Sequence, residues 1–148
     1  MTAGYSGTPL AKKLGIKEGF FVVTIHRPAH YLELLGPCPD GVLMIERAFY
    51  GMYVDEVGFR QEPEIVHLFT NSRDELFGEL SELRNFIKQD GSIWVSWYKK
   101  AAKLPTEITE DTVRDAAFPL GLVDVKVCAV DDKWSGLKLV IRKENRTK

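Results

Sequence analysis

The second half of the chain alternates between short apolar runs and segments with helical periodicity, and this alternation restricts the fold more than any other feature. Apolar, β-branched and aromatic runs occupy residues 65–70 and 92–98, and helix signals follow each of them. Strands separated by helices of this length need crossover connections, which are right-handed and leave the strands parallel within one sheet. We therefore predict an α/β domain with helices on both faces of a mostly parallel sheet.

The helix signals in this half have a clear physical basis. Ser72 suits an N-cap, and Glu75 follows at the spacing of a capping box. A second helix can begin after Thr109 and end at Pro119 and Gly121. Four residues of the first helix recur at helical spacing and predict its buried face: Leu76, Leu80, Leu83 and Ile87.

The chain ends in two further apolar runs, residues 123–130 and 137–142, joined by the turn-type sequence DDKWSG. They predict a C-terminal antiparallel hairpin. Trp94 and Trp97 lie three positions apart on the preceding strand and should therefore point to opposite faces of the sheet.

The first half is less regular. Thr8 and Pro9 suit the start of a short helix, and Gly15 suits its end. Residues 19–25 predict a buried strand and residues 42–48 a second one. One or two helical turns are expected over residues 30–35, giving about six strands in the whole domain by counting apolar runs.

Composition narrows the class of protein. The chain has 148 residues, enough for a single domain over residues 1–148 with a core of its own. Its 20 basic and 21 acidic side chains give a net charge of -1, unlike the basic surface of a nucleic-acid binder. No apolar run approaches the ~20 residues that span a bilayer, and the first residues lack a secretory signal. With only two cysteines, we expect a cytoplasmic protein with no nucleic-acid or membrane partner.

Three motifs carry a resemblance to a known family: GTPLAKKLGIKEG at 7–19, GSIWVSWYKK at 91–100 and GLVDVKVCAVDDKWSGLKLVIR at 121–142. They resemble a family of small bacterial proteins of unknown function, distantly similar in fold to S-adenosylmethionine-dependent methyltransferases. The resemblance implies a compact Rossmann-like sheet and no particular chemistry. It leaves out residues 49–62, which we interpret as a family-specific insertion.

Methyltransferases of this fold place a glycine-rich turn after the first strand, because the backbone must approach the cofactor closely. The corresponding residues 24–31, TIHRPAHY, contain no glycine, and His26, Arg27 and Pro28 occupy the turn. Glu46 is the candidate for the acidic residue that ends the second strand; a solvated glutamate is the alternative. We therefore predict no cofactor.

Three predicted strand ends supply polar and cationic side chains to one edge of the sheet. In open α/β sheets, ligands bind beyond the carboxyl ends of the strands. The free N–H groups at the helix start of Ser72 add positive potential there. The predicted anion site consists of His26, Arg27, Asn71, Ser72, Ser96, Trp97, Lys99 and Lys100. Alternatively, Ser72 is only a cap, and Lys99 and Lys100 belong to a solvated loop.

Other chemistry has little support in the sequence. His26 and His30 have the i, i+4 spacing of a zinc-binding helix, but Pro28 between them interrupts such a helix, so no metal site is predicted. Cys128 lies within the apolar run VKVCAV and should be an inert thiol.

These observations favour a non-catalytic cytoplasmic module that binds or regulates, recognising an anionic small molecule or a protein partner. The alternative is a divergent S-adenosylmethionine-dependent methyltransferase-like enzyme with a remodelled cofactor pocket. A third hypothesis is a structural subunit that forms a homodimer through Phe49, Tyr50 and Tyr53.

Overall fold

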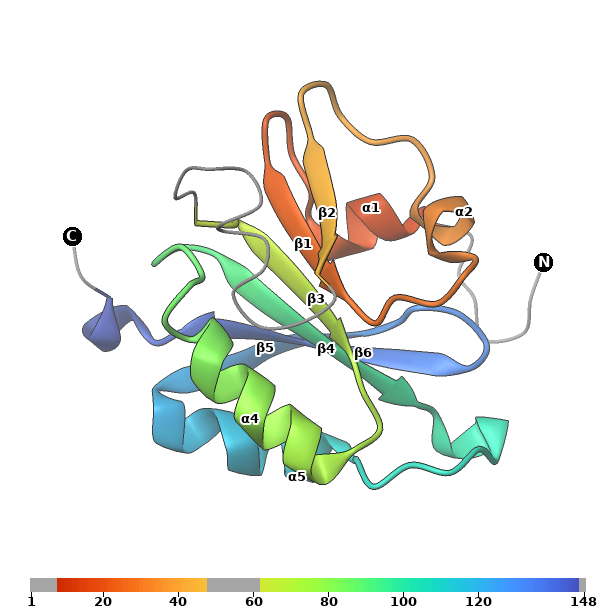
Figure 1. Cartoon of the computed structure of the whole chain (residues 1–148), viewed down its shortest axis with the longest axis vertical. Helices are drawn as coiled ribbons and strands as arrows, with labels where there is room; N and C mark the ends of the chain where they lie inside the picture. Colours follow the sequence, from red (N-terminus) through yellow and green to blue (C-terminus); the bar gives the residue numbers. More distant parts are fainter. Residues whose placement is uncertain (1–7, 48–61, 147–148) are drawn as a thin grey trace.

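A computed structural model describes residues 8–47 and 62–146. Its six strands are β1 Phe21–Ile25, β2 Leu43–Arg47, β3 Ile65–Phe69, β4 Ser92–Tyr98, β5 Leu122–Ala129 and β6 Trp134–Ile141. They form one sheet in the order β2-β1-β3-β4-β6-β5 (Figure 1). β1 to β4 run parallel to one another, whereas β6 is antiparallel to both β4 and β5. The predicted fold class, including the C-terminal hairpin, is confirmed.

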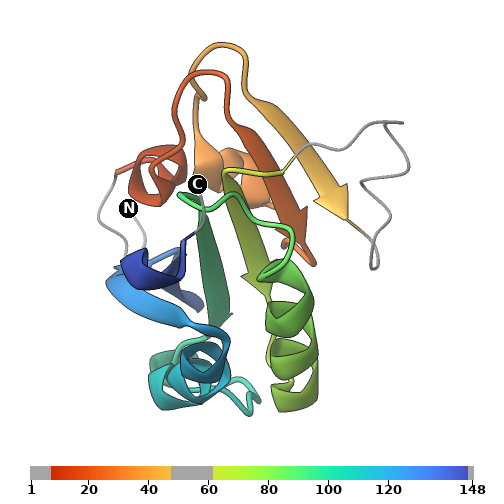
Figure 2. The ribbon, with the colours of Figure 1, turned by 90° about the vertical axis from the view of Figure 1, so that its left-hand side faces the viewer.

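Four α-helices and three short 3-10 turns complete the described chain. The α-helices are α1 Leu10–Leu14, α2 Tyr31–Leu35, α4 Arg73–Leu83 and α5 Glu110–Ala117. The 3-10 turns are η1 Lys100–Ala102, η2 Phe118–Leu120 and η3 Lys143–Asn145. The helices α4 and α5 lie side by side below the sheet (Figures 1 and 2).

The sheet separates two apolar clusters. On one face, α4 packs against the strands through Leu76, Leu80 and Leu83, and Ile87 joins them from just beyond the end of this helix; all four are at most 2% exposed. The helix α5 adds Val113, Ala116 and Ala117 to the same cluster. On the other face, α1 and α2 cover a second cluster. Trp97 belongs to the first cluster and Trp94 to the second, as the spacing predicts for opposite faces of a strand.

Three local expectations need correction. Pro9, not Thr8, precedes the first turn of α1. The predicted turn DDKWSG is shorter than expected, because β6 begins at Trp134, which pairs with Tyr98 of β4. The capping box at Ser72 is only half formed: its hydroxyl accepts from the backbone N–H of Glu75, but the Glu75 carboxylate turns to Thr70.

The remaining predictions about organisation are tested only in part. Residues 49–61, which include Phe49, Tyr50 and Tyr53, lie outside the described residues, so the insertion and the dimer remain predictions. Across residues 8–47 and 62–146, no helix is long and apolar enough to cross a membrane.

Candidate functional site

The carboxyl ends of β1, β3 and β4 meet at one edge of the sheet, because these strands are parallel and adjacent. This edge carries the predicted anion-site residues. The structure distributes them over three places: the turn after β1, the start of α4 with the sheet beneath it, and a groove at the end of β4.

The turn after β1 is closed by the protein itself. The Glu46 carboxylate accepts hydrogen bonds from the Thr24 hydroxyl at 2.5 Å and from the backbone N–H of His26 at 3.0 Å. Arg27 Nε lies 3.7 Å from the same carboxylate. His26 has φ of 58°, a left-handed conformation that is uncommon for residues other than glycine. Glu46 thus holds a strained turn in place.

A second carboxylate faces the same turn. Glu75 accepts a hydrogen bond from the Thr70 hydroxyl, and its other oxygen lies 3.4 Å from Nδ1 of His26. Both His26 and Arg27 therefore face carboxylates. This balance of charge disfavours a free anion at the β1 end of the edge.

The polar residues between β3 and β4 have structural roles. Asn71 Oδ1 accepts the backbone N–H of Tyr98 at 2.8 Å, which joins the two strand ends. Ser72 caps α4. Ser96 is fully buried, and its hydroxyl hydrogen-bonds Nε2 of His67 at 2.8 Å.

Ser96 is the end of a buried polar chain that the sequence did not reveal. His67 of β3 hydrogen-bonds the Tyr31 hydroxyl of α2 through Nδ1 at 2.8 Å, and all three residues are fully buried. Burial lowers the pKa of His67 to about 3 and raises the pKa of Tyr31 above its ordinary range. The imidazole is therefore neutral, with one nitrogen donating and the other accepting. The only sequence signal for this buried polar chain is a histidine within the otherwise apolar strand β3.

The groove lies beyond β4 and has a volume of about 400 Å³. It brings together three predicted residues, Trp97, Lys99 and Lys100, with Tyr98 between them. Its remaining lining consists of Thr106, Ile108, Thr109, Glu110 and Ser135. The backbone N–H of Lys99 donates to the backbone carbonyl oxygen of Lys133 at 2.8 Å. This hydrogen bond attaches Lys99 to the turn of the β5–β6 hairpin.

The described residues contain no group of three or more side chains suited to hold a metal ion. Burial raises the pKa of both Cys38 and Cys128, so neither thiol is activated as a nucleophile.

The fold defines a class of protein. A methyltransferase described as dependent on S-adenosylmethionine, from Aquifex aeolicus, is 15% identical over 89% of this chain and 88% of its own, with a TM-score of 0.54. Magnesium protoporphyrin IX methyltransferase from Synechocystis, with the cofactor bound, is 11% identical over 84% and 71%, with a TM-score of 0.56. A protein of the NADB-Rossmann superfamily from Streptococcus agalactiae is 10% identical over 98% and 73%, with a TM-score of 0.59.

The chain is thus a Rossmann-like, methyltransferase-like α/β protein by fold. It belongs to the family described as protein of unknown function (DUF3052), whose model matches residues 51–143. This confirms the predicted resemblance to a family of unknown function; the motif at 7–19 lies outside the matched residues. No curated protein matches the sequence.

The fold class implies S-adenosylmethionine, but the residues do not fit its conventional mode of binding. That mode needs a glycine turn after the first strand and a free acid at the end of the second. Here His26 occupies the turn, and the Glu46 carboxylate is bound by Thr24 and the His26 backbone. Glu46 thus occupies the position of a ribose-binding acid, but both of its carboxylate oxygens accept hydrogen bonds from the protein itself.

Proposed function

We propose that this protein is a non-catalytic cytoplasmic module that binds an anionic small molecule carrying an apolar ring, in the groove at the end of β4. The observation that carries the proposal is the pairing of two lysines with an aromatic and aliphatic wall at the ligand-binding edge of the fold.

The charge of the groove favours an anion. Among the residues that the structure describes, neither Lys99 nor Lys100 forms an ion pair. The acid in the lining, Glu110, is bound by Arg114 at 2.9 Å. The lysines therefore contribute positive charge that no described carboxylate neutralises.

The lining also favours a ring. Trp97, Tyr98 and Ile108 supply apolar surface, and the Tyr98 ring packs at 4.5 Å between centroids on Trp134. This packing fixes the ring before a ligand arrives, which lowers the entropic cost of binding. An aromatic ring bearing a phosphate or carboxylate would suit both the two lysines and the apolar wall of the groove.

The hydroxyl groups of the lining support binding over catalysis. Thr106 Oγ1 accepts the backbone N–H of Ile108 at 3.2 Å, and Thr109 Oγ1 accepts that of Thr112 at 3.3 Å. Among the described residues, neither hydroxyl forms a hydrogen bond with a histidine or a carboxylate that would activate it as a nucleophile. The enzyme alternative rests on the fold alone.

The probe for this proposal is phenyl phosphate, titrated calorimetrically into the purified protein. We expect saturable binding that weakens at least about tenfold, or about 1.4 kcal/mol, in Lys99→Ala/Lys100→Ala. Inorganic phosphate and phenol, each carrying one half of the probe, should bind the groove more weakly.

The matched control is Lys12→Ala/Lys143→Ala, which removes the same charge from residues outside the groove. It should bind phenyl phosphate as the wild type does. Equal affinity of the wild type and the Lys99/Lys100 variant would contradict the proposal.

A further inference from the structure

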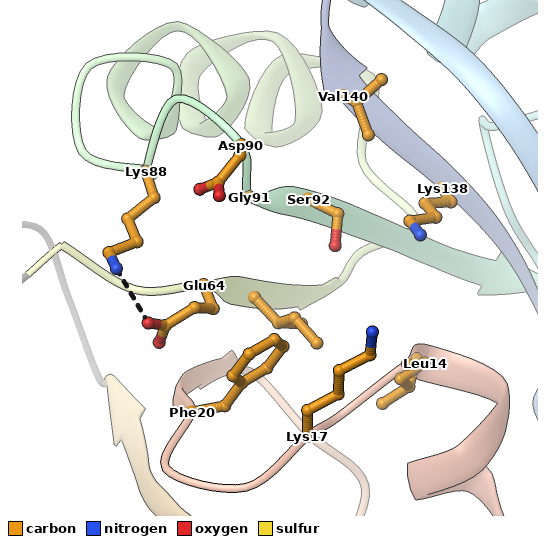
Figure 3. A pocket seen from close by; sticks show the side chains of 12 residues that line it. Leu14, Lys17, Phe20, Glu64, Lys88, Asp90, Gly91, Ser92, Lys138 and Val140 are labelled. Atoms are coloured by element: carbon orange, nitrogen blue, oxygen red, sulfur yellow. Dashed lines mark ion pairs between the residues drawn. The ribbon is translucent and has the colours of Figure 1, made fainter. Parts of the chain in front are cut away.

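A separate cavity of about 320 Å³, seen in Figure 3, is lined by residues at the other end of the parallel strands from the groove. It is formed where β3 and β4 begin, near the end of α1 and the start of β1. Its lining includes Lys17, Glu64, Lys88, Ser92 and Lys138. The parallel strands place this edge away from their carboxyl ends, so the cavity shares no residue with the groove.

The carboxylate of Glu64 is fully committed within the protein. One oxygen accepts the backbone N–H of Phe21 at 2.6 Å, and the other lies 3.1 Å from Nζ of Lys88. The hydrogen bond from Lys88 to Glu64 raises the pKa of this lysine. Lys88 and Glu64 therefore neutralise each other at one side of the cavity, as Figure 3 shows.

Two further lysines have no such partner. Figure 3 shows the ammonium ends of Lys17 and Lys138 directed into the same space, while Asp90 lies across it on the side of Lys88. Neither Lys17 nor Lys138 forms an ion pair within the part of the chain that the structure describes. The two ammonium groups leave this side of the cavity positively charged.

The position of Lys138 makes this charge unusual. It lies in the middle of β6 between Leu137 and Leu139, which are fully buried, and it is itself only half-exposed. Its neighbour across the antiparallel pair is Lys126. Like charges directly opposite on adjacent strands are destabilising, and a bound anion would relieve that repulsion.

A hydroxyl completes the arrangement. Ser92 opens β4, is 6% exposed and lies between Asp90 and Lys138 in Figure 3. Its backbone N–H donates to the backbone carbonyl oxygen of Glu64 at 2.9 Å, and its hydroxyl makes no hydrogen bond to any described residue. At Gly91 a Cβ would come within 2.7 Å of the Glu64 carbonyl oxygen, so only glycine permits this close approach of the two strand starts.

We propose that this cavity binds the phosphate group of a small molecule, with Lys17 and Lys138 as its charge partners and the Ser92 hydroxyl as a hydrogen-bond donor. A phosphate has several strong acceptor oxygens, and lysine serves it as a flexible point charge. The volume lies at the lower end of the range of about 300–1,000 Å³ typical of small-molecule sites. A compact ligand is therefore expected.

The test is a titration of ¹⁵N-labelled protein with inorganic phosphate and with glycerol phosphate, at ionic strength held constant with sodium chloride. We expect saturable shifts of the Lys17, Gly91, Ser92 and Lys138 amides. The affinity should fall at least tenfold in Lys17→Ala/Lys138→Ala and in the shape-conserving Lys17→Gln/Lys138→Gln. Tighter binding of glycerol phosphate would identify a phosphorylated metabolite, and equal binding would identify free phosphate.

The controls separate this cavity from the groove of the proposed function. Lys99→Ala/Lys100→Ala and Lys12→Ala/Lys143→Ala should both retain these shifts. Shifts that do not saturate, or that persist unchanged in the Lys17/Lys138 variants, would overturn the proposal. So would shifts confined to the residues of the groove.

Discussion

His67 shows how one residue can join three elements. Its imidazole links α2 to β4 through Tyr31 and Ser96, and it stacks on Phe69 with ring centroids 4.2 Å apart. A buried polar group without a hydrogen-bond partner lowers the free energy of unfolding by about 1–3 kcal/mol. The hydroxyls of Tyr31 and Ser96 avoid this cost by hydrogen-bonding both nitrogens of His67. A histidine within an apolar strand is visible in the sequence. Its partners Tyr31 and Ser96 lie 36 and 29 positions away along the chain, so the sequence does not identify them.

The depressed pKa of His67 predicts a dependence of stability on pH. Between about pH 6.5 and about pH 3 the unfolded chain binds a proton that the folded protein excludes, so unfolding takes up a proton. The free energy of unfolding should therefore fall as the pH is lowered, with His67 contributing up to about 1.4 kcal/mol per pH unit. Urea unfolding at several pH values should show a shallower dependence in His67→Gln.

A direct measurement checks the same claim without a variant. The imidazole resonances of His67 should not titrate in the folded protein near the ordinary histidine pKa of about 6.5. A midpoint close to that value would show that the side chain is accessible to protons and would contradict its burial.

At the scale of elements, the helix starts show which parts of a site sequence can predict. Ser72 and Thr109 were identified as caps because capping is a local interaction. The second role of Glu75 could not be predicted in this way, since it depends on Thr70 and on His26 from the turn after β1. The buried ion pair of Arg47 with Glu79, which joins β2 to α4, escaped prediction for the same reason.

The cap at Ser72 can be tested within a single helix. Ser72→Ala removes the acceptor of the Glu75 N–H and should lower the free energy of unfolding by about 1 kcal/mol. Ser81→Ala is the matched control, because Ser81 is exposed within α4 and alanine has the higher helix propensity. Denaturant unfolding measures both, and equal stability of the two variants would show that the cap contributes little.

At the scale of the whole molecule, the fold was predictable because alternating strands and helices allow few topologies. The site was predictable only in outline. Parallel strands guarantee that their carboxyl ends share an edge, which placed all the predicted residues near one another. Side-chain orientation then divided them: Ser96 points into the core, whereas Lys99 and Lys100 line the groove.

We propose that this protein has a methyltransferase-like fold without the usual cofactor corner and that it binds an anion at the end of β4. The most direct measurement compares amide shifts of ¹⁵N-labelled protein titrated separately with S-adenosylmethionine and with phenyl phosphate. We predict that phenyl phosphate shifts residues 97–100 saturably and that millimolar S-adenosylmethionine leaves residues 24–27 unmoved. Saturable shifts of residues 24–27 by S-adenosylmethionine, with none at 97–100 by phenyl phosphate, would contradict the account.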